Sequence, residues 1–153
     1  MKKIVQTKTR ESLLMRGELK VNVYENEKLI NSLSENNMVV TLGKTNIAKL
    51  LGGDAAGKKI DQISVGTSNT STAVGDSAIT GAFTKAILSV AYPSAQSIQF
   101  NFEIENDEAN GMTIREFGLL NTDDVLFARK VRGTDIIKTS AIRLVGSWTI
   151  TIN

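Results

Sequence analysis

Two residue types are missing from this sequence, and each absence excludes a kind of chemistry. The 153 residues include no cysteine and no histidine. Without cysteine, the chain can form neither a disulfide nor a thiolate metal site. Without histidine, it lacks the commonest general base and the commonest transition-metal ligand, so catalysis would depend on carboxylates, lysine, tyrosine, serine or threonine. We therefore expect a protein that is not an enzyme and that carries no cofactor.

Apolar runs, aromatic residues and excess charge are also scarce. No run of about 18 apolar residues occurs, and the start of the chain lacks the apolar segment of a secretory signal, so neither a membrane span nor export is predicted. Aromatic residues make up only 5% of the chain, which weighs against sugar stacking. The net charge of +2 does not indicate a nucleic-acid-binding protein.

The charges that are present are unevenly distributed. Residues 1–17 mix charged and scattered apolar residues with only a weak period, which predicts an assembly arm ahead of a single domain at residues 18–153. The basic residues of this arm are Lys2, Lys3, Lys8, Arg10 and Arg16. Acidic residues gather later, at Glu103, Glu105, Asp107, Glu108, Asp123 and Asp124. The arm and the acidic patch either dock onto neighbouring copies or are both solvated surface.

Most of the domain has the alternation of half-buried β-strands. Three segments place apolar residues at every second position: residues 19–23, 98–104 and 142–152. Residues 28–33, 60–66 and 83–91 are further candidate strands, and the turn after the last of these is expected at Tyr92-Pro93-Ser94. Because the final strand is long and apolar, we expect it to hold the C-terminus in the core.

One helix is predicted at about residues 40–52. Val40, Ile47, Leu50 and Leu51 would share one face, Asn37 or Thr41 would cap the start, and Gly52-Gly53 would end it. Gly43-Lys44-Thr45 within this segment matches the end of a phosphate-binding loop. The motif also requires a glycine five positions earlier, where this chain has Met38, so nucleotide binding is not predicted.

A long segment of small residues separates two of the strands. Residues 67–82 are rich in serine, threonine, glycine and alanine, which bury little apolar surface. This composition predicts a surface loop or a rim that other chains cover, and we favour a packing role over a binding role.

A hairpin at residues 110–132 carries a charged pair on its apolar faces. Glu116 would lie in a row with Met112, Ile114 and Gly118, and Arg129 in a row with Val125, Phe127 and Val131. A buried charge is tolerated only with a partner, so we predict that Glu116 and Arg129 form a structural ion pair, with a subunit contact as one possible setting. A catalytic role is less favoured, because a neighbouring arginine lowers the pKa of a glutamate and makes it a poor acid or base.

Several strands at short intervals, turn residues between them and a single helix define the expected fold. We predict a mainly β protein, an antiparallel β-sandwich or barrel with one α-helix at about residues 40–52 and an N-terminal arm.

Several motifs also follow one another in a characteristic order. They are VTLGKTNIAKLLGG at 40–53, IDQISVGT at 60–67, EANGMTIREFGLL at 108–120, LFAR at 126–129, Lys138, and WTITI at 148–152. Over residues 38–153 the chain resembles a family of small structural proteins of tailed bacteriophages, described as tail-fibre or baseplate-associated. The resemblance implies a virion protein that assembles in the host bacterial cytoplasm, with copies of itself and other virion proteins as partners. It supplies no catalytic residues.

Three functions are compatible with these observations. The first is an oligomeric tail, baseplate or fibre-adaptor component that acts by protein–protein assembly through its arm and strand edges. The second is a capsid decoration, neck or collar protein, or a receptor- or carbohydrate-binding module that uses the Ser/Thr loop. The third is an enzyme that holds Mg²⁺ or Ca²⁺ on Asp107, Glu108, Asp123 and Asp124, although acidic residues in turns are usually only solvated.

Overall fold

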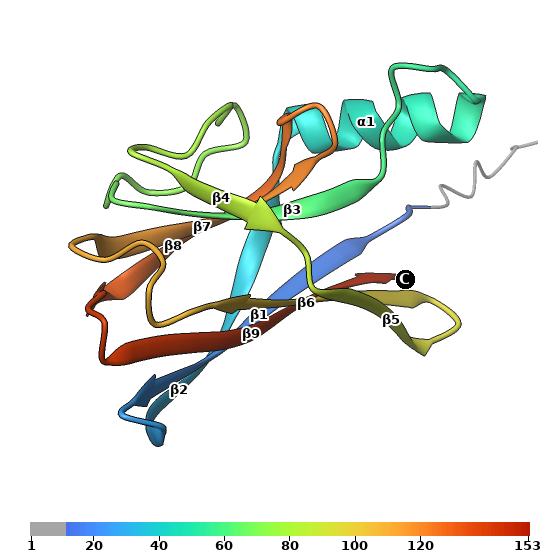
Figure 1. Cartoon of the computed structure of the whole chain (residues 1–153). Helices are drawn as coiled ribbons and strands as arrows, with labels where there is room; N and C mark the ends of the chain where they lie inside the picture. The colour runs from blue at the N-terminus through green and yellow to red at the C-terminus, as the bar shows by residue number, and fades with distance from the viewer. Residues whose placement is uncertain (1–11) are drawn as a thin grey trace, which may run out of the picture.

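The structure is a computed structural model that describes residues 12–153, and within that range nine antiparallel strands and one helix form the fold (Figure 1). The strands lie in one sheet with the order β4-β3-β7-β8-β2-β1-β9-β6-β5. In chain order they are β1 (Met15–Glu25), β2 (Lys28–Val39), β3 (Ile60–Gly66), β4 (Phe83–Ala86), β5 (Ser89–Ser94), β6 (Ser97–Ile104), β7 (Thr113–Asn121), β8 (Leu126–Ile137) and β9 (Ile142–Ile152), and the helix α1 (Thr41–Gly52) follows β2.

The sheet curls into a half-barrel with two facing layers, and β2 belongs to both. Its first part pairs with β1, from Lys28 to Asn37, whereas Met38 and Val39 pair with Arg129 and Ala128 of β8. Figure 1 shows β2 crossing from the layer of β1, β9, β6 and β5 to the layer of β3, β4, β7 and β8. The prediction of a mainly β, sandwich- or barrel-like fold with one helix is therefore confirmed.

The main core lies between the two layers. The alternation predicted for residues 19–23 is confirmed, because Leu19, Val21 and Val23 are all buried. Trp148 of β9 is fully buried, and across the layers the Phe102 and Phe117 rings lie 6.2 Å apart. Each fully buried side chain of this kind contributes about 1.5–3 kcal/mol, so the strands that carry them are stabilised mainly by this contact between layers.

Helix α1 spans nearly the predicted residues but buries only part of the predicted face. Gly43 and Asn46 are its buried residues, whereas Leu50 and Leu51 remain 46% and 83% exposed. A side chain at Gly43 would overlap the carbonyl oxygen of Phe127, so the absence of one lets the helix lie directly on β8. The predicted face is partly correct, because Val40 is buried and Ile47 packs against the main core. The two leucines remain exposed because the close backbone approach at Gly43 orients the helix.

The ends of α1 are only partly as predicted. Val40 occupies the N-cap position without a side-chain hydrogen bond, so neither Asn37 nor Thr41 caps the helix. Gly53 ends the helix in the left-handed region, at φ 69°, which glycine adopts without strain.

Several strand boundaries differ from the sequence-based expectation. The strand predicted at residues 28–33 continues to Val39, and the strand predicted at residues 83–91 is divided into β4 and β5. Residues 92–94 continue β5 instead of forming a turn, because Ser94 still pairs with Ser97 of β6. The predicted arm boundary after residue 17 falls inside β1, which begins at Met15 and pairs with β9 from that residue onward. Backbone hydrogen bonds between Leu14 and Asn153 extend this contact by one more residue.

Candidate functional site

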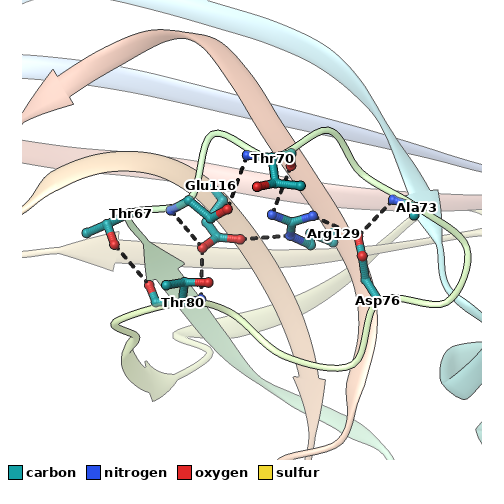
Figure 2. Close-up of polar contacts among 8 residues, drawn as sticks. Thr67, Thr70, Ala73, Asp76, Thr80, Glu116 and Arg129 are labelled. Carbon is teal, nitrogen blue, oxygen red and sulfur yellow. Dashed lines mark hydrogen bonds and ion pairs between the residues drawn. The ribbon is translucent and has the colours of Figure 1, made fainter.

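The two charges that the sequence placed on apolar faces meet in the structure. Arg129 of β8 donates from Nε to Oε2 of Glu116 on β7 at 2.7 Å, and the side chains are 5% and 0% exposed. Figure 2 shows both side chains enclosed by one loop, residues 67–82. The loop belongs to the same chain, so the pair is buried without a second subunit.

The loop satisfies the carboxylate of Glu116 through its backbone. The amides of Ser68 and Thr80 donate to Oε1 of Glu116 at 3.0 and 2.8 Å (Figure 2). These two amides come from opposite ends of the loop. One carboxylate oxygen therefore joins both ends of the loop to β7, while the other oxygen binds the guanidinium.

The same loop satisfies the guanidinium of Arg129. Nη1 donates to Asp76 at 2.7 Å, and Nη2 donates to the carbonyl oxygen of Thr70 at 3.2 Å (Figure 2). Burial works to raise the pKa of Asp76, but the Ala73 amide and the Arg129 guanidinium outweigh it and hold that pKa below its ordinary value. Burial likewise works to lower the pKa of Arg129, but the hydrogen bonds that its guanidinium donates to Asp76 and Glu116 outweigh burial and raise that pKa. Asp76 and Arg129 are therefore both charged at neutral pH.

Two glycines allow the loop to lie this close to the sheet. A Cβ atom on Gly66 would stand 2.6 Å from both Oε1 of Glu116 and the carbonyl oxygen of Thr80. A Cβ atom on Gly118 would stand 2.7 Å from the Ile79 side chain. The motif segments ISVGT and EFGLL thus contain glycine at the points where loop and strands touch.

Register shifts divide the residues that were expected to share one face. A shift between Ile114 and Glu116 turns Ile114 into the main core and Glu116 toward loop 67–82. A second register shift between β7 and β8 lies between Leu119 and Leu120. On β8, Phe127 packs in the main core, whereas Arg129 faces the loop. The predicted single apolar rows were wrong because a bulge reverses the alternation of side chains.

This arrangement is a structural cross-link. Both carboxylate oxygens of Glu116 and all three guanidinium nitrogens of Arg129 already have partners, and neither side chain is more than 5% exposed. No group is left to bind a substrate or to accept a proton from one. The chemical capacity of the pair is therefore to hold the loop against β7 and β8.

The burial of two further cations was not predicted from the sequence. Lys138 is fully buried, and its Nζ donates to Asn106 O, Asn110 Oδ1 and Thr139 O at 3.3, 3.0 and 3.1 Å. Burial lowers the pKa of Lys138. The ammonium group therefore holds the connection between β6 and β7 against the end of β8. No local pattern reveals this role, because all three acceptors lie in turns.

Arg132 is the second of these cations and is less well satisfied. Its side chain is 1% exposed, and its Nε lies 3.8 Å from Oε2 of Glu35. Neither Nε nor Nη1 has a hydrogen-bond partner among residues 12–153. Burial lowers the pKa of Arg132.

The acidic patch does not form a metal site within the described residues. No group of three or more potential ligands lies together in residues 12–153. Glu108 binds Lys85 at 2.6 Å, and Glu103 pairs with Arg143. Asp124 accepts a hydrogen bond from Gln62 at 2.8 Å. Glu108 and Glu103 are thus paired with cations, while Asp124 serves a contact between strands.

Most of the predicted basic arm cannot be placed. Lys2, Lys3, Lys8 and Arg10 lie outside the described residues. Arg16 is exposed on β1, within the sheet.

An apolar groove under α1 is the main surface feature that the sequence did not predict. It has a volume of about 500 Å³ and is lined by apolar side chains of α1, β1, β5, β6, β8 and β9. Six of the fourteen exposed large apolar residues of the described chain lie along it: Leu13, Leu50, Leu51, Val90, Tyr92 and Ile152. The only charged side chain in the lining is Lys59. This concentration of exposed apolar surface is typical of an interaction site.

Comparison with known proteins does not identify a family for this chain. No protein-family model matches the sequence, and no curated protein or solved structure matches it either. Within residues 12–153, no helix has the length and apolar character needed to cross a lipid bilayer.

Proposed function

We propose that this chain is a structural protein of a tailed bacteriophage particle that works by protein–protein assembly. It is a tail, baseplate or fibre-adaptor component, and its partners are copies of itself and other virion proteins. The observation that supports assembly is the apolar groove under α1 with its six exposed apolar side chains. The bacteriophage context rests on the ordered motifs between residues 40 and 152.

The buried charges are consistent with this role. Glu116 and Arg129 have every polar atom engaged in holding the chain's own loop, and Lys138 is engaged by three acceptors of its own chain. Their chemistry is used for rigidity. A rigid domain with an exposed apolar groove suits a component that must bind its neighbours in a fixed geometry.

Assembly is tested on particles and on the purified chain. Cryo-electron microscopy of particles from the bacteriophage that encodes this sequence should reveal density into which residues 12–153 fit, repeated by the symmetry of a ring or collar. Sedimentation velocity of the purified chain should detect oligomers. A purified monomer, together with particles in which no density fits, would overturn the proposal.

The proposed arm has its own test. The deletion must stop at residue 11, because Leu14 is hydrogen-bonded to Asn153 and Met15 begins β1. A chain lacking residues 2–11 should fold, as judged by the fluorescence of buried Trp148, yet enter particles poorly. Normal incorporation of the shortened chain would exclude the arm from assembly.

A binding module is the second candidate, and the outer face of β1, β2, β6 and β9 favours it. A shallow depression of about 430 Å³ there is lined largely by hydroxyl and amide side chains, including Asn22, Ser32, Gln99 and Asn101. Such groups can hydrogen-bond a sugar or a receptor. The Ser/Thr loop first considered for this role is instead engaged with Glu116 and Arg129. Binding of the isolated chain to host cells would favour this candidate.

A further inference from the structure

The apolar groove under α1 is open because of the way the helix is anchored. Gly43 lies against β8, and Asn46 accepts a hydrogen bond from Asn121 at 3.0 Å and donates to Lys58 O at 2.8 Å. These contacts hold the helix by one face. The leucines of the last turn then project beside the groove instead of filling it.

Each wall of the groove carries a protruding apolar side chain. Leu51 of α1 is 83% exposed and Tyr92 of β5 is 74% exposed. Between them lie half-buried and buried side chains that include Ile98 and Phe100 of β6. One surface therefore holds both projections and a hollow of matching chemistry, which is the requirement for a self-complementary contact.

We propose that this groove is the contact between two copies of the chain, related by a two-fold axis, with Leu51 and Tyr92 of each copy seated in the groove of the other. The inference rests on the proposed assembly function and names both the surface and the occupant.

The available apolar area is sufficient for such a dimer. The six exposed side chains along the groove offer on the order of 100 Å² each. Two copies together would bury on the order of 1,200 Å², which reaches the lower limit for a specific protein–protein interface.

The charges favour a second copy of the chain, and not the N-terminal residues of the same chain, as the occupant of the groove. Residues 1–11 contain Lys2, Lys3, Lys8 and Arg10 against a single acid, Glu11. The only charged group in the lining is also a cation, Lys59, which lies 4.0 Å from Asp61. A basic segment would find no opposite charge in the groove, whereas an apolar surface of a second copy requires none.

The two outermost strands of the sheet disfavour strand addition at those edges as the way to join copies. The edge strand β4 has only four residues, and the edge strand β5 contains Pro93, which has no N–H to donate. Short edges and proline are devices that prevent pairing with another chain. Contact through side chains in the groove is therefore favoured over strand addition at β4 or β5.

The test uses the full chain and sedimentation velocity over about 1–100 μM, a range in which a moderate dimer dissociates. Leu51→Glu should weaken the dimer about tenfold or more, because a two-fold interface carries each substitution twice. Tyr92→Ser on the opposite wall should weaken it as well. Ile137→Glu is the matched control, since Ile137 is 69% exposed at the far end of β8 from the groove residue Phe127.

Folding is checked separately from association. Leu51 is 83% exposed, so Leu51→Glu should leave the urea midpoint reported by Trp148 unchanged. If the wild-type chain forms oligomers that neither groove variant weakens, copies meet elsewhere, and this inference fails while assembly stands. If the wild type is monomeric and removal of residues 2–11 produces a dimer that Leu51→Glu dissociates, the arm occupies the groove and the inference is likewise overturned. A monomer in every form, absent from particles, would overturn the proposed function as well.

Discussion

Removing the guanidinium of Arg129 should destabilise the protein far more than removing that of the half-buried Arg115 on the neighbouring strand. Arg129→Met would leave the carboxylate of Glu116, 0% exposed, with only the amides of Ser68 and Thr80 as partners. It would also release Asp76 and the carbonyl oxygen of Thr70. Breaking a buried ion pair by removing one partner costs about 3–5 kcal/mol. That is a large part of the stability of an ordinary domain, about 5–15 kcal/mol.

The assay is urea unfolding followed by the fluorescence of Trp148. This residue is the only tryptophan in the chain and is fully buried between the layers. With an m-value of about 2 kcal/mol/M, the loss should lower the urea midpoint by roughly 2 M. Glu116→Gln, which removes the charge and replaces one of the two accepting oxygens by an NH₂ group, should cost about 1.5–3 kcal/mol.

Arg115→Met is the matched control. Arg115 pairs with Asp135 at 3.1 Å, but the side chains are 35% and 47% exposed. An exposed pair contributes only about 0–1 kcal/mol. If Arg129→Met and Arg115→Met lowered the free energy of unfolding equally, burial of the Glu116–Arg129 pair would not explain its role, and the reasoning would be refuted.

Three further predictions concern pH, helix packing and the C-terminal strand. The pKa of Asp76 is lower in the folded chain than its ordinary value of 3.8, so the stabilisation from Asp76 should be complete above that value and be lost as the pH falls through the folded pKa. In urea unfolding between about pH 2 and 7, the free energy of unfolding should therefore decline less steeply toward acid pH for Asp76→Asn than for the wild type. An identical slope for the two proteins would contradict this. Gly43→Ala should destabilise the chain by about 1–3 kcal/mol, because its methyl group would overlap the Phe127 carbonyl oxygen. Gly52→Ala in the same helix meets nothing within 4 Å and should be neutral or gain up to about 1 kcal/mol; similar urea midpoints for the two variants would refute the close-packing argument. Removal of residues 148–153 should abolish the cooperative transition in circular dichroism, since β9 pairs with both β1 and β6 along that stretch, and a retained transition would show that the rest of the sheet folds without it.

The division between local and tertiary information can be followed in the strands. The alternation at residues 19–23 and 142–152 identified β1 and β9 because a strand places successive side chains on opposite faces, a property of the local backbone. The same rule placed Glu116 and Arg129 on the hairpin and predicted that they would meet. It could not show the bulges of β7 and β8, because an extra residue in a ladder is visible only against the partner strand.

The tertiary structure alone decided which segments cover each face of the sheet and of the helix. Nothing in residues 67–82 indicates that their backbone amides would surround Glu116, since every residue type carries the same N–H group. Lys138 and Arg132 were likewise missed because their surroundings come from distant parts of the chain. The helix is the clearest example: its limits follow from its residues, but the face that it buries follows from the close fit of Gly43 against β8. The sequence by itself thus determined most of the strands and the helix, because those patterns are local. Only the tertiary structure decided where several strands end, which polar groups are enclosed and which leucines are left exposed beside a groove.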